Sequence, residues 1–323
     1  MTALTGDKSP VTLLKEKEVK FLEHVKYEHL IAGTTAGTVA TLILHPLDLV
    51  KIRFAIHDGI HGTPKYSSIA NAFVTIHRSE GFQGLYKGVK PNICGAGASW
   101  GLYFFFYNSI KNFIQGGNVN KPLGAGYHLL AASQAGFTTL LLTNPIWVVK
   151  TRLCLQFSNT DKPNSYNGML DCLAKIYKTS GLKGYYKGLV PGIFGVSHGA
   201  VQFMAYEEMK NNYQHYYDLP ISQKLGTLEY LTFSASSKLI AVLVTYPYQV
   251  VRARLQNQHY SYKGSLDCLK KIAKHEGWKG FYKGLGTNLI RVIPATMITF
   301  LVYENISHLL LTRKNSNDKP SEP

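Results

Sequence analysis

Long uncharged segments alternate with short charged ones along most of the chain. Each long segment carries at most one Lys, Arg, Asp or Glu, and each is about as long as the ~20 residues that cross a bilayer as a helix. The six segments are 30–47, 92–110, 122–149, 189–206, 230–251 and 292–312. Short stretches with apolar residues at helical spacing, such as 170–177, fall between them. The pattern predicts an all-α membrane protein with six transmembrane helices and three short amphipathic helices.

Small residues are common in the long segments. Ala32, Gly33, Ala36 and Gly37 follow one another at a spacing that lets two helix backbones approach closely within a membrane. The alternative is a soluble array of helical repeats, whose buried faces we expect to be filled mainly by Leu and Ile. The abundance of Gly, Ala, Ser and Thr therefore favours the membrane protein.

Two short motifs occur three times in the same order and divide the chain into repeats. The first reads PLDLVKIR at 46–53, PIWVVKTR at 145–152 and PYQVVRAR at 247–254. The second is a glycine followed by a Tyr-Lys-Gly triplet, with the residues Gly81, Tyr86, Gly88, Gly181, Tyr186, Gly188, Gly277, Tyr282 and Gly284. Recurrence at a fixed period indicates repeated structural units. We divide the chain into a tail at 1–25, repeats at 26–117, 118–216 and 217–313, and a tail at 314–323.

The composition narrows the classes of function. Of the 323 residues, 45% are apolar, so a disordered chain is excluded, and the net charge of +16 indicates an anionic partner. The four cysteines form no C-x-x-C pair. We find neither metal-ligand spacing nor a nucleophile with its base, so we expect no metal site and no enzyme activity. The N-terminus mixes acids and lysines and is not typical of a signal or transit peptide.

These motifs resemble those of the mitochondrial carrier family, in which P-x-[D/E]-x-x-[K/R]-x-[K/R] occurs in three tandem copies. The resemblance extends over about residues 25 to 312. It implies a monomer with six transmembrane helices around a pseudo-threefold axis in the inner mitochondrial membrane. It also implies a short helix on the matrix side of each repeat and a central cavity that opens alternately to each side. The glycines and Tyr-Lys-Gly triplets would place backbone N–H groups where a phosphate of cardiolipin can bind.

In this family, the positions two and five residues after each proline form a ring of ion pairs, the matrix gate. The corresponding residues are Asp48, Lys51, Trp147, Lys150, Gln249 and Arg252. The resemblance implies an ion pair between Asp48 and Lys150 and a hydrogen bond between Lys51 and Gln249.

The second repeat departs from the pattern, because Trp147 stands where an acidic residue is expected. We predict that its ring lies against Arg252 in a cation–π contact of ~1 kcal/mol. We also expect Gln256, four residues after Arg252, to brace this gate. With one true ion pair, the matrix gate is predicted to be weak. The alternative is that these charges are ordinary helix-end charges in solvated loops.

A second ring is implied at the opposite ends of the even-numbered segments, the cytoplasmic gate. Its residues are Tyr107, Asn108, Lys111, Tyr206, Glu207, Lys210, Tyr303, Glu304 and Ser307. The implied pairs are Glu304 with Lys111, Glu207 with Ser307, and Asn108 with Lys210. Only the first of these is a full ion pair, which suits a gate that must open in every transport cycle.

The substrate site is expected between the gates, at positions where the repeats differ. The candidate residues are Gly95, Ala96, Trp147, Phe194, Gly195, Lys238 and Arg291. Arg291 has no acidic residue at its predicted depth, so we expect its guanidinium to bind an anionic group of the substrate. Lys238 either faces the cavity or extends to the membrane surface. Trp147 is predicted to stack on a planar ring.

Cationic and aromatic candidates together favour a flat, anionic substrate. The runs 95–108 and 246–254 resemble those of family members that carry folate or flavin adenine dinucleotide. We therefore expect alternating-access transport of either compound into the matrix, as cargo rather than as a cofactor. The alternatives are a pyrimidine-nucleotide or NAD carrier and, from another class, a non-transporting membrane scaffold. A nucleic-acid-binding protein is disfavoured because many Lys and Arg residues cluster at helix ends.

Overall fold

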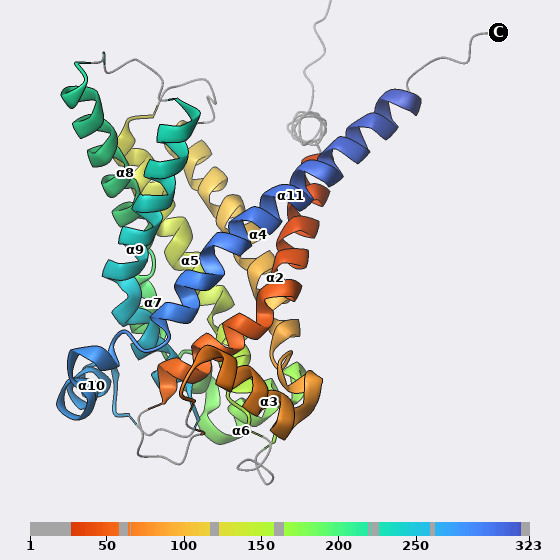
Figure 1. Cartoon of the computed structure of the whole chain (residues 1–323), viewed down its shortest axis with the longest axis vertical. Helices are drawn as coiled ribbons and strands as arrows, with labels where there is room; N and C mark the ends of the chain where they lie inside the picture. Colours follow the sequence, from red (N-terminus) through yellow and green to blue (C-terminus); the bar gives the residue numbers. More distant parts are fainter. Residues whose placement is uncertain are drawn as a thin grey trace, which may run out of the picture. The chain divides into compact units, whose positions relative to one another are not determined.

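The computed structural model describes residues 27–57, 64, 66–116, 123–157, 165–218, 220, 226–258 and 262–317 (Figure 1). The described part is helical and contains no strand, as the uncharged segments predict. The chain forms two compact units. The larger unit comprises residues 41–293, and the smaller one comprises 1–40 and 294–323.

Three long helices each contain a proline from the repeated motif. They are α2 (Tyr27–Ile56), α5 (Ala125–Cys154) and α9 (Thr227–Gln256). The other long helices are α4 (Val89–Ile114), α8 (Ser197–Tyr216) and α11 (Leu285–Asn317). In the larger unit, α4 packs along α5 and α8 packs along α9. Within the described residues, two helices, α9 and α11, are long and apolar enough to cross a membrane by composition alone.

The second long segment of the middle repeat differs from the prediction, because it forms two helices. The short helix α7 (Leu189–Phe194) ends at Gly195, and α8 begins at Ser197. A Cβ on Gly195 would lie 3.0 Å from the hydroxyl of Tyr248, so this turn fits tightly against α9. The interruption is thus a point of close approach between helices.

The residue before each motif proline is buried and bonds to a backbone carbonyl in the second motif of its own repeat or directly before the triplet. The Nε2 atom of His45 lies 2.9 Å from the carbonyl oxygen of Lys87. The amide of Asn144 donates to the carbonyl of Tyr185 at 2.7 Å, and the hydroxyl of Tyr246 donates to a third such carbonyl, that of Lys283, at 3.2 Å. His45, Asn144 and Tyr246 thus make equivalent contacts although they are different residue types. A comparison of the repeat sequences does not indicate this equivalence.

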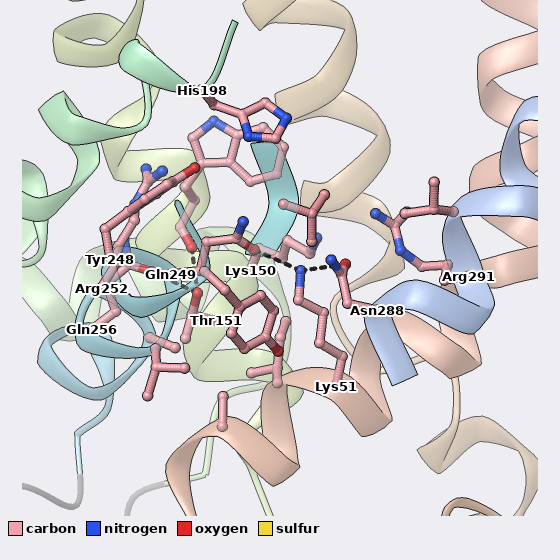
Figure 2. Close-up of a pocket in the computed structure, with 18 of the residues that line it drawn as sticks. Lys51, Lys150, Thr151, His198, Tyr248, Gln249, Arg252, Gln256, Asn288 and Arg291 are labelled. Atoms are coloured by element: carbon pink, nitrogen blue, oxygen red, sulfur yellow. Dashed lines mark hydrogen bonds between the residues drawn. The ribbon is translucent and has the colours of Figure 1, made fainter. Parts of the chain in front are cut away.

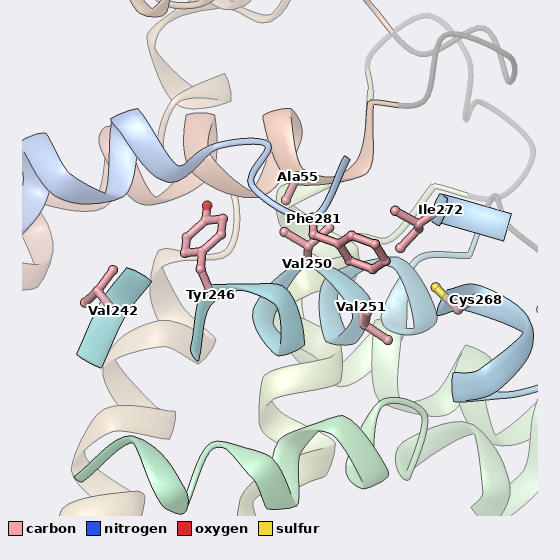
Figure 3. Packing of buried hydrophobic residues seen from close by; sticks show 8 residues of the cluster. All are labelled: Ala55, Val242, Tyr246, Val250, Val251, Cys268, Ile272 and Phe281. Carbon is pink, nitrogen blue, oxygen red and sulfur yellow. The ribbon is translucent and has the colours of Figure 1, made fainter. Parts of the chain in front are cut away.

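Three shorter helices cover the turns that follow the prolines. They are α3 (Ile69–Gly84), α6 (Met169–Tyr185) and α10 (Ser265–Gly280), which gather at the lower end of the larger unit in Figure 1. Figure 3 shows the packing in the third repeat, where Cys268 and Ile272 of α10 lie beside Val250 and Val251 of α9. Each short helix is bent at its motif glycine, whose positive φ of +57° to +70° favours glycine.

A buried ion bridge ties the short helix of the first repeat to its long helix. Arg53, the last residue of the proline motif, donates to both oxygens of Glu80, at 2.6 and 2.9 Å. Lys87 lies 2.7 Å from the same carboxylate. Burial alone would raise the pKa of Glu80, but the hydrogen bonds from Arg53 and Lys87 hold that pKa below its usual value.

The third repeat contains the same bridge. Arg254 donates to both oxygens of Glu276, and Lys283 lies against the same carboxylate. Both arginines are about 1% exposed, so each depends on its glutamate for a counter-charge. We call these two sets the Arg–Glu–Lys bridges.

The described part of the smaller unit comes from the first turns of α2 and the last turns of α11. Ala32 and Ala36 are fully buried, as expected of small residues at a close helix contact. Around Gly33 and Gly37, however, a Cβ would meet nothing within 4 Å. The alanines, rather than the glycines, therefore occupy the buried face.

Candidate functional site

A cavity of about 390 Å³ lies in the larger unit, beside the prolines of α5 and α9 (Figure 2). Its volume is within the range of roughly 300–1,000 Å³ that is typical of small-molecule sites. Five cationic side chains line it: Lys51, Lys150, Lys238, Arg252 and Arg291. Trp147, His198, Tyr246 and Tyr248 supply rings. Cations and rings therefore share one cavity, as the sequence predicts.

Asp48 is the carboxylate that contacts these cations within the described residues. Its Oδ2 atom lies 3.6 Å from Nζ of Lys150, which confirms the predicted ion pair of the matrix gate. Its Oδ1 atom lies 3.0 Å from Nε of Arg291. The N–H of this Nε does not point at an acceptor, so the contact is an ion pair without a hydrogen bond. Asn92 also approaches Asp48, at 3.4 Å.

The contact with Asp48 corrects the prediction that Arg291 has no acidic residue at its depth. The prediction measured depth along α11 alone, whereas the neighbouring acid comes from α2. The guanidinium keeps its two Nη groups for other contacts, and the side chain of Arg291 is 29% exposed toward the cavity. Arg291 therefore remains placed to bind an anion, but it is not isolated.

Lys51 joins α2 to two other helices. Its ammonium donates to the side-chain oxygen of Gln249 at 2.9 Å, which confirms the predicted hydrogen bond, and to that of Asn288 at 2.8 Å. Figure 2 shows Lys51 between these two partners. Nothing in the motifs indicated Asn288, because it lies in the first turn of α11 outside both of them.

The prediction for Trp147 was wrong about its cation. The ammonium of Lys150 lies over the indole, 5.2 Å from the ring centroid. Arg252 instead donates to the side-chain oxygen of Asn144 at 3.2 Å. Residues 147 and 150 are neighbours on one helix surface, so the contact within α5 forms more readily than one to α9.

Gln256 makes a contact between helices at the predicted matrix gate. Its side-chain oxygen accepts a hydrogen bond of 2.7 Å from the hydroxyl of Thr151, which links α9 to α5. The link is buried, with Gln256 only 2% exposed. Together with the pairs of Lys51 and Asp48, it closes the network on three sides.

Four of the predicted substrate contacts lie outside the cavity lining. Gly95 and Ala96 do not line it, because Gly95 is packed against the indole of Trp147, where a Cβ would lie 3.4 Å from the ring. Phe194 is 64% exposed and lies outside the lining, and Gly195 abuts Tyr248 as described above. The prediction located Phe194 and Gly195 from helical spacing, which fails where α7 ends.

His198 takes the place predicted for Phe194. It lies one helical turn further along the chain, lines the cavity and bonds through Nδ1 to the hydroxyl of Thr245 at 2.8 Å. Lys238 also lines the cavity, which decides between the two positions predicted for it.

The residues of the predicted cytoplasmic gate are divided between the two compact units. Glu207 and Lys210 lie 3.8 Å apart on α8, so the charged partner of Lys210 is on its own helix, not the predicted Asn108. Tyr107 bonds to Nδ1 of His128 at 2.8 Å, and the ring of Tyr206 meets that of Tyr230 edge-on. Tyr303, Glu304 and Ser307 belong to the other compact unit from Lys111, so their pairs stay predictions.

The Tyr-Lys-Gly glycines mark close contacts between repeats. Gly88, Gly188 and Gly284 all have positive φ, between +75° and +85°. A Cβ on each would lie 2.8–3.1 Å from the carbonyl oxygen of the fifth residue after proline in another repeat: Lys150, Arg252 and Lys51 respectively. The glycines therefore let adjacent repeats pack. Their predicted lipid contacts, with those of Gly81, Gly181, Gly277 and the triplet tyrosines, stay predictions.

The chain is similar to known transporters over nearly its whole length. It matches the family described as mitochondrial carrier protein at 23–118, 121–217 and 223–314. It is 41% identical to Folate transporter 1, chloroplastic, of Arabidopsis thaliana, over 91% of this chain and 98% of that protein. It is 38% identical to Nicotinamide adenine dinucleotide transporter 1, chloroplastic, of the same plant, over 87% and 91%. It is 33% identical to the Mitochondrial FAD carrier protein FLX1 of Saccharomyces cerevisiae, over 88% and 97%.

Proposed function

The chain belongs to the mitochondrial carrier family, and on that premise we propose that it transports flavin adenine dinucleotide, a folate or both across a membrane. The single observation that carries this proposal is the charge of the cavity. Five cations line it, and Asp48 is the one carboxylate that contacts them in the described part of the chain. Such an excess of desolvated positive charge is costly unless an anion binds there.

Both proposed substrates carry two negative charges beside a flat heteroaromatic ring. The diphosphate of the dinucleotide and the glutamate of the folate match the planar guanidinium of Arg291 and the ammonium of Lys51. Trp147, Tyr248 and His198 lie in the same cavity and offer ring faces or edges to a heterocycle. A small inorganic anion would leave these rings unused.

The transport step requires the network around Asp48 and Lys51 to open. It consists of one weakly paired carboxylate and several hydrogen bonds, each worth about 0.5–1.5 kcal/mol. Substrate that binds Arg291 and Lys51 competes for the cations that hold the network closed. Binding energy is thereby available to shift the equilibrium between the closed and open states.

A nicotinamide dinucleotide is the second candidate, because two of the similar plant proteins are named as transporters of it. It shares the diphosphate with the flavin dinucleotide, so the cations do not distinguish the two. The distinction depends on the ring-binding end, near Trp147 and His198. We further propose that the carrier resides in the inner mitochondrial membrane and imports its cargo into the matrix.

Uptake into proteoliposomes tests the proposal. The purified full-length chain is reconstituted and offered radiolabelled flavin adenine dinucleotide, a reduced folate, NAD and a pyrimidine nucleotide. We expect uptake of the flavin dinucleotide or the folate, and competition between them. Lys178→Ala, at an exposed cation of α6, is the matched control for Arg291→Ala and should keep normal uptake. Uptake of NAD or the pyrimidine nucleotide alone would refute the proposed substrate, and no uptake of any compound would favour a scaffold.

A further inference from the structure

The middle repeat lacks the acid of the Arg–Glu–Lys bridge. Ser180 stands where the first and third repeats have Glu80 and Glu276, directly before the motif glycine. A Cβ built on the following Gly184 would lie 2.8 Å from the Cβ of Ser180. The equivalent distances in the other repeats are 2.4 Å to Glu80 and 2.7 Å to Glu276. The backbone is therefore the same, and only the carboxylate is missing.

The arginine of the middle repeat is buried all the same. Arg152 is 4% exposed, and its Nη1 donates to the hydroxyl of Tyr166 at 3.2 Å. Its Nε has no hydrogen-bond partner in the described residues. In the other two repeats, the same Nε donates to a backbone carbonyl of the adjoining repeat, that of Cys154 or Ala55, at 3.1 Å. The arginine of the middle repeat thus lacks both of these interactions within the described part.

Lys187 completes the set of unmatched cations. It occupies the position of Lys87 and Lys283, which both contact a glutamate. Partial burial and the nearby charge of Arg152 lower the pKa of Lys187. The charges of Arg152 and Lys187 therefore repel each other, whereas in the other repeats a carboxylate lies between the equivalent cations. Such unmatched buried charge destabilises the fold.

We propose that Arg152, Ser180 and Lys187 form a binding site for a phosphate group. The guanidinium offers a planar fork, the ammonium offers a second charge, and the hydroxyl adds a hydrogen bond. Replacement of a glutamate by a serine leaves space for the anion where the carboxylate would lie. The site is separate from the cavity, because none of its three residues lines that cavity. A phosphate here would do for the middle repeat what the glutamates do for the others.

The phosphate group has two natural sources. It is either a soluble phosphate on the matrix side or the headgroup of an anionic phospholipid. Both present the same oxygens to Arg152 and Lys187. The difference is that a lipid also inserts acyl chains beside the helices, so it acts only in a bilayer or a mixed micelle.

Thermal unfolding of the purified full-length protein in neutral detergent tests the site. Inorganic phosphate is titrated at constant ionic strength, and cardiolipin is added in a separate series with phosphatidylcholine as its control. We expect one of the two anions to raise the melting temperature by about 1–2 °C or more, the shift that ~1 kcal/mol produces in a protein of this size. Ser180→Glu should raise the melting temperature without any anion and should make the response to the stabilising anion smaller than in the wild type.

Two further variants remove the competing explanations. Arg291→Ala deletes a cation of the cavity, so a response to phosphate that is unchanged in this variant does not depend on Arg291. Asp161→Asn removes the acid of the loop 158–164, which lies outside the described residues. It should leave the melting temperature and the response unchanged.

Three outcomes would overturn the proposal. The first is a shift in melting temperature, with phosphate or with cardiolipin, that is as large in Ser180→Glu as in the wild type. The second is the absence of any response to either anion. The third is a loss of stability in Asp161→Asn as large as that of Glu80→Ala, which would make Asp161 the acid of this bridge. None of these results depends on uptake, so the transport proposal stands or falls separately.

Discussion

The cations of the cavity differ from those of the two Arg–Glu–Lys bridges, because only the bridge cations are matched by acids. In the first and third repeats, Arg53 and Arg254 each form two hydrogen bonds with one glutamate. In the cavity, five cations have one carboxylate in contact within the described residues. Balanced charges are typical of groups that hold the fold, and unbalanced charges of groups that await an anionic ligand.

The difference also separates what recurs in the repeats from what varies. The bridge residues recur in two repeats and stabilise the same helix contact in each. The cavity residues Trp147, Arg291 and Lys238 have no counterpart of the same type in the other repeats. A substrate without threefold symmetry needs such unequal positions, whereas a helix that recurs three times needs equal ones. The middle repeat is the exception, because its bridge has lost the acid.

Removal of a bridge glutamate should have the largest effect. Glu276→Ala leaves Arg254 buried without its carboxylate, which typically costs about 3–5 kcal/mol, and we expect the melting temperature to fall by about 4–7 °C. Ser180→Ala, at the same position of the middle repeat, is the matched control and should change the melting temperature by about 1 °C at most. Similar losses in both variants would show that the bridges do not depend on their acid.

Substitution of Arg291 should impair transport without unfolding the protein. Loss of one charge-assisted hydrogen-bonding group of ~1.5–3 kcal/mol predicts about a 10- to 100-fold fall in uptake at low substrate concentration for Arg291→Ala. Arg291→Lys keeps the charge but loses the planar fork, so it should also transport poorly. Initial uptake rates, with the melting temperature as the folding control, decide the matter. Near-normal uptake by the alanine variant would remove Arg291 from the site.

An acid in place of Trp147 should give the cations of the cavity a further carboxylate partner, as the arginines of the Arg–Glu–Lys bridges have. In Trp147→Asp, the new carboxylate lies one turn from Lys150 and near Arg252, where it adds an ion pair worth about 1–2 kcal/mol in this partly buried setting. We therefore expect the melting temperature to rise by a few degrees while uptake falls several-fold, because the closed network is firmer and a stacking ring is lost. A decrease in melting temperature would identify Trp147 as a packing residue against Gly95.

The smallest effect is expected at the cytoplasmic gate. Glu304→Lys and Lys111→Glu each place like charges at a predicted contact and should each slow uptake, whereas the exchange of both should restore part of the rate. The coupling energy should be about 0.5–1 kcal/mol, typical of a partly solvated pair. A double-mutant cycle on uptake rates measures it. Simple additivity of the two single variants would show that Glu304 and Lys111 do not meet.

Contacts between motif residues were predicted more successfully than contacts of residues outside the motifs. The pairs Asp48–Lys150 and Lys51–Gln249 were predictable, because the resemblance to the carrier family implies which positions after the motif prolines face one another. His198 and Asn288 were not, because neither lies in a motif. An uneven pattern could have indicated His198, since it is a polar residue within an uncharged segment that was assigned to the cavity.

Arg291 shows most clearly where sequence reasoning ended. Spacing along α11 predicted the depth of Arg291 within that helix. The guanidinium group of the side chain predicted its affinity for anions. Its ion pair with Asp48 depends on the separation of two helices that are about 240 residues apart in sequence, and no period along a single helix encodes that separation. For the same reason, the prediction that Arg252 is the cation over Trp147 was wrong, because Lys150 takes that position.

The sequence by itself determined the three repeats, most of the long and short helices, and the cationic, aromatic character of the site. These properties follow from local periodicity and residue type, which act over a few helical turns. Tertiary structure alone decided which cation meets which acid, that Gly95 receives the ring of Trp147, and that Arg152 is buried beside a serine instead of a glutamate. Each of these depends on the distance between helix axes, because ion pairs and close packing change within one ångström.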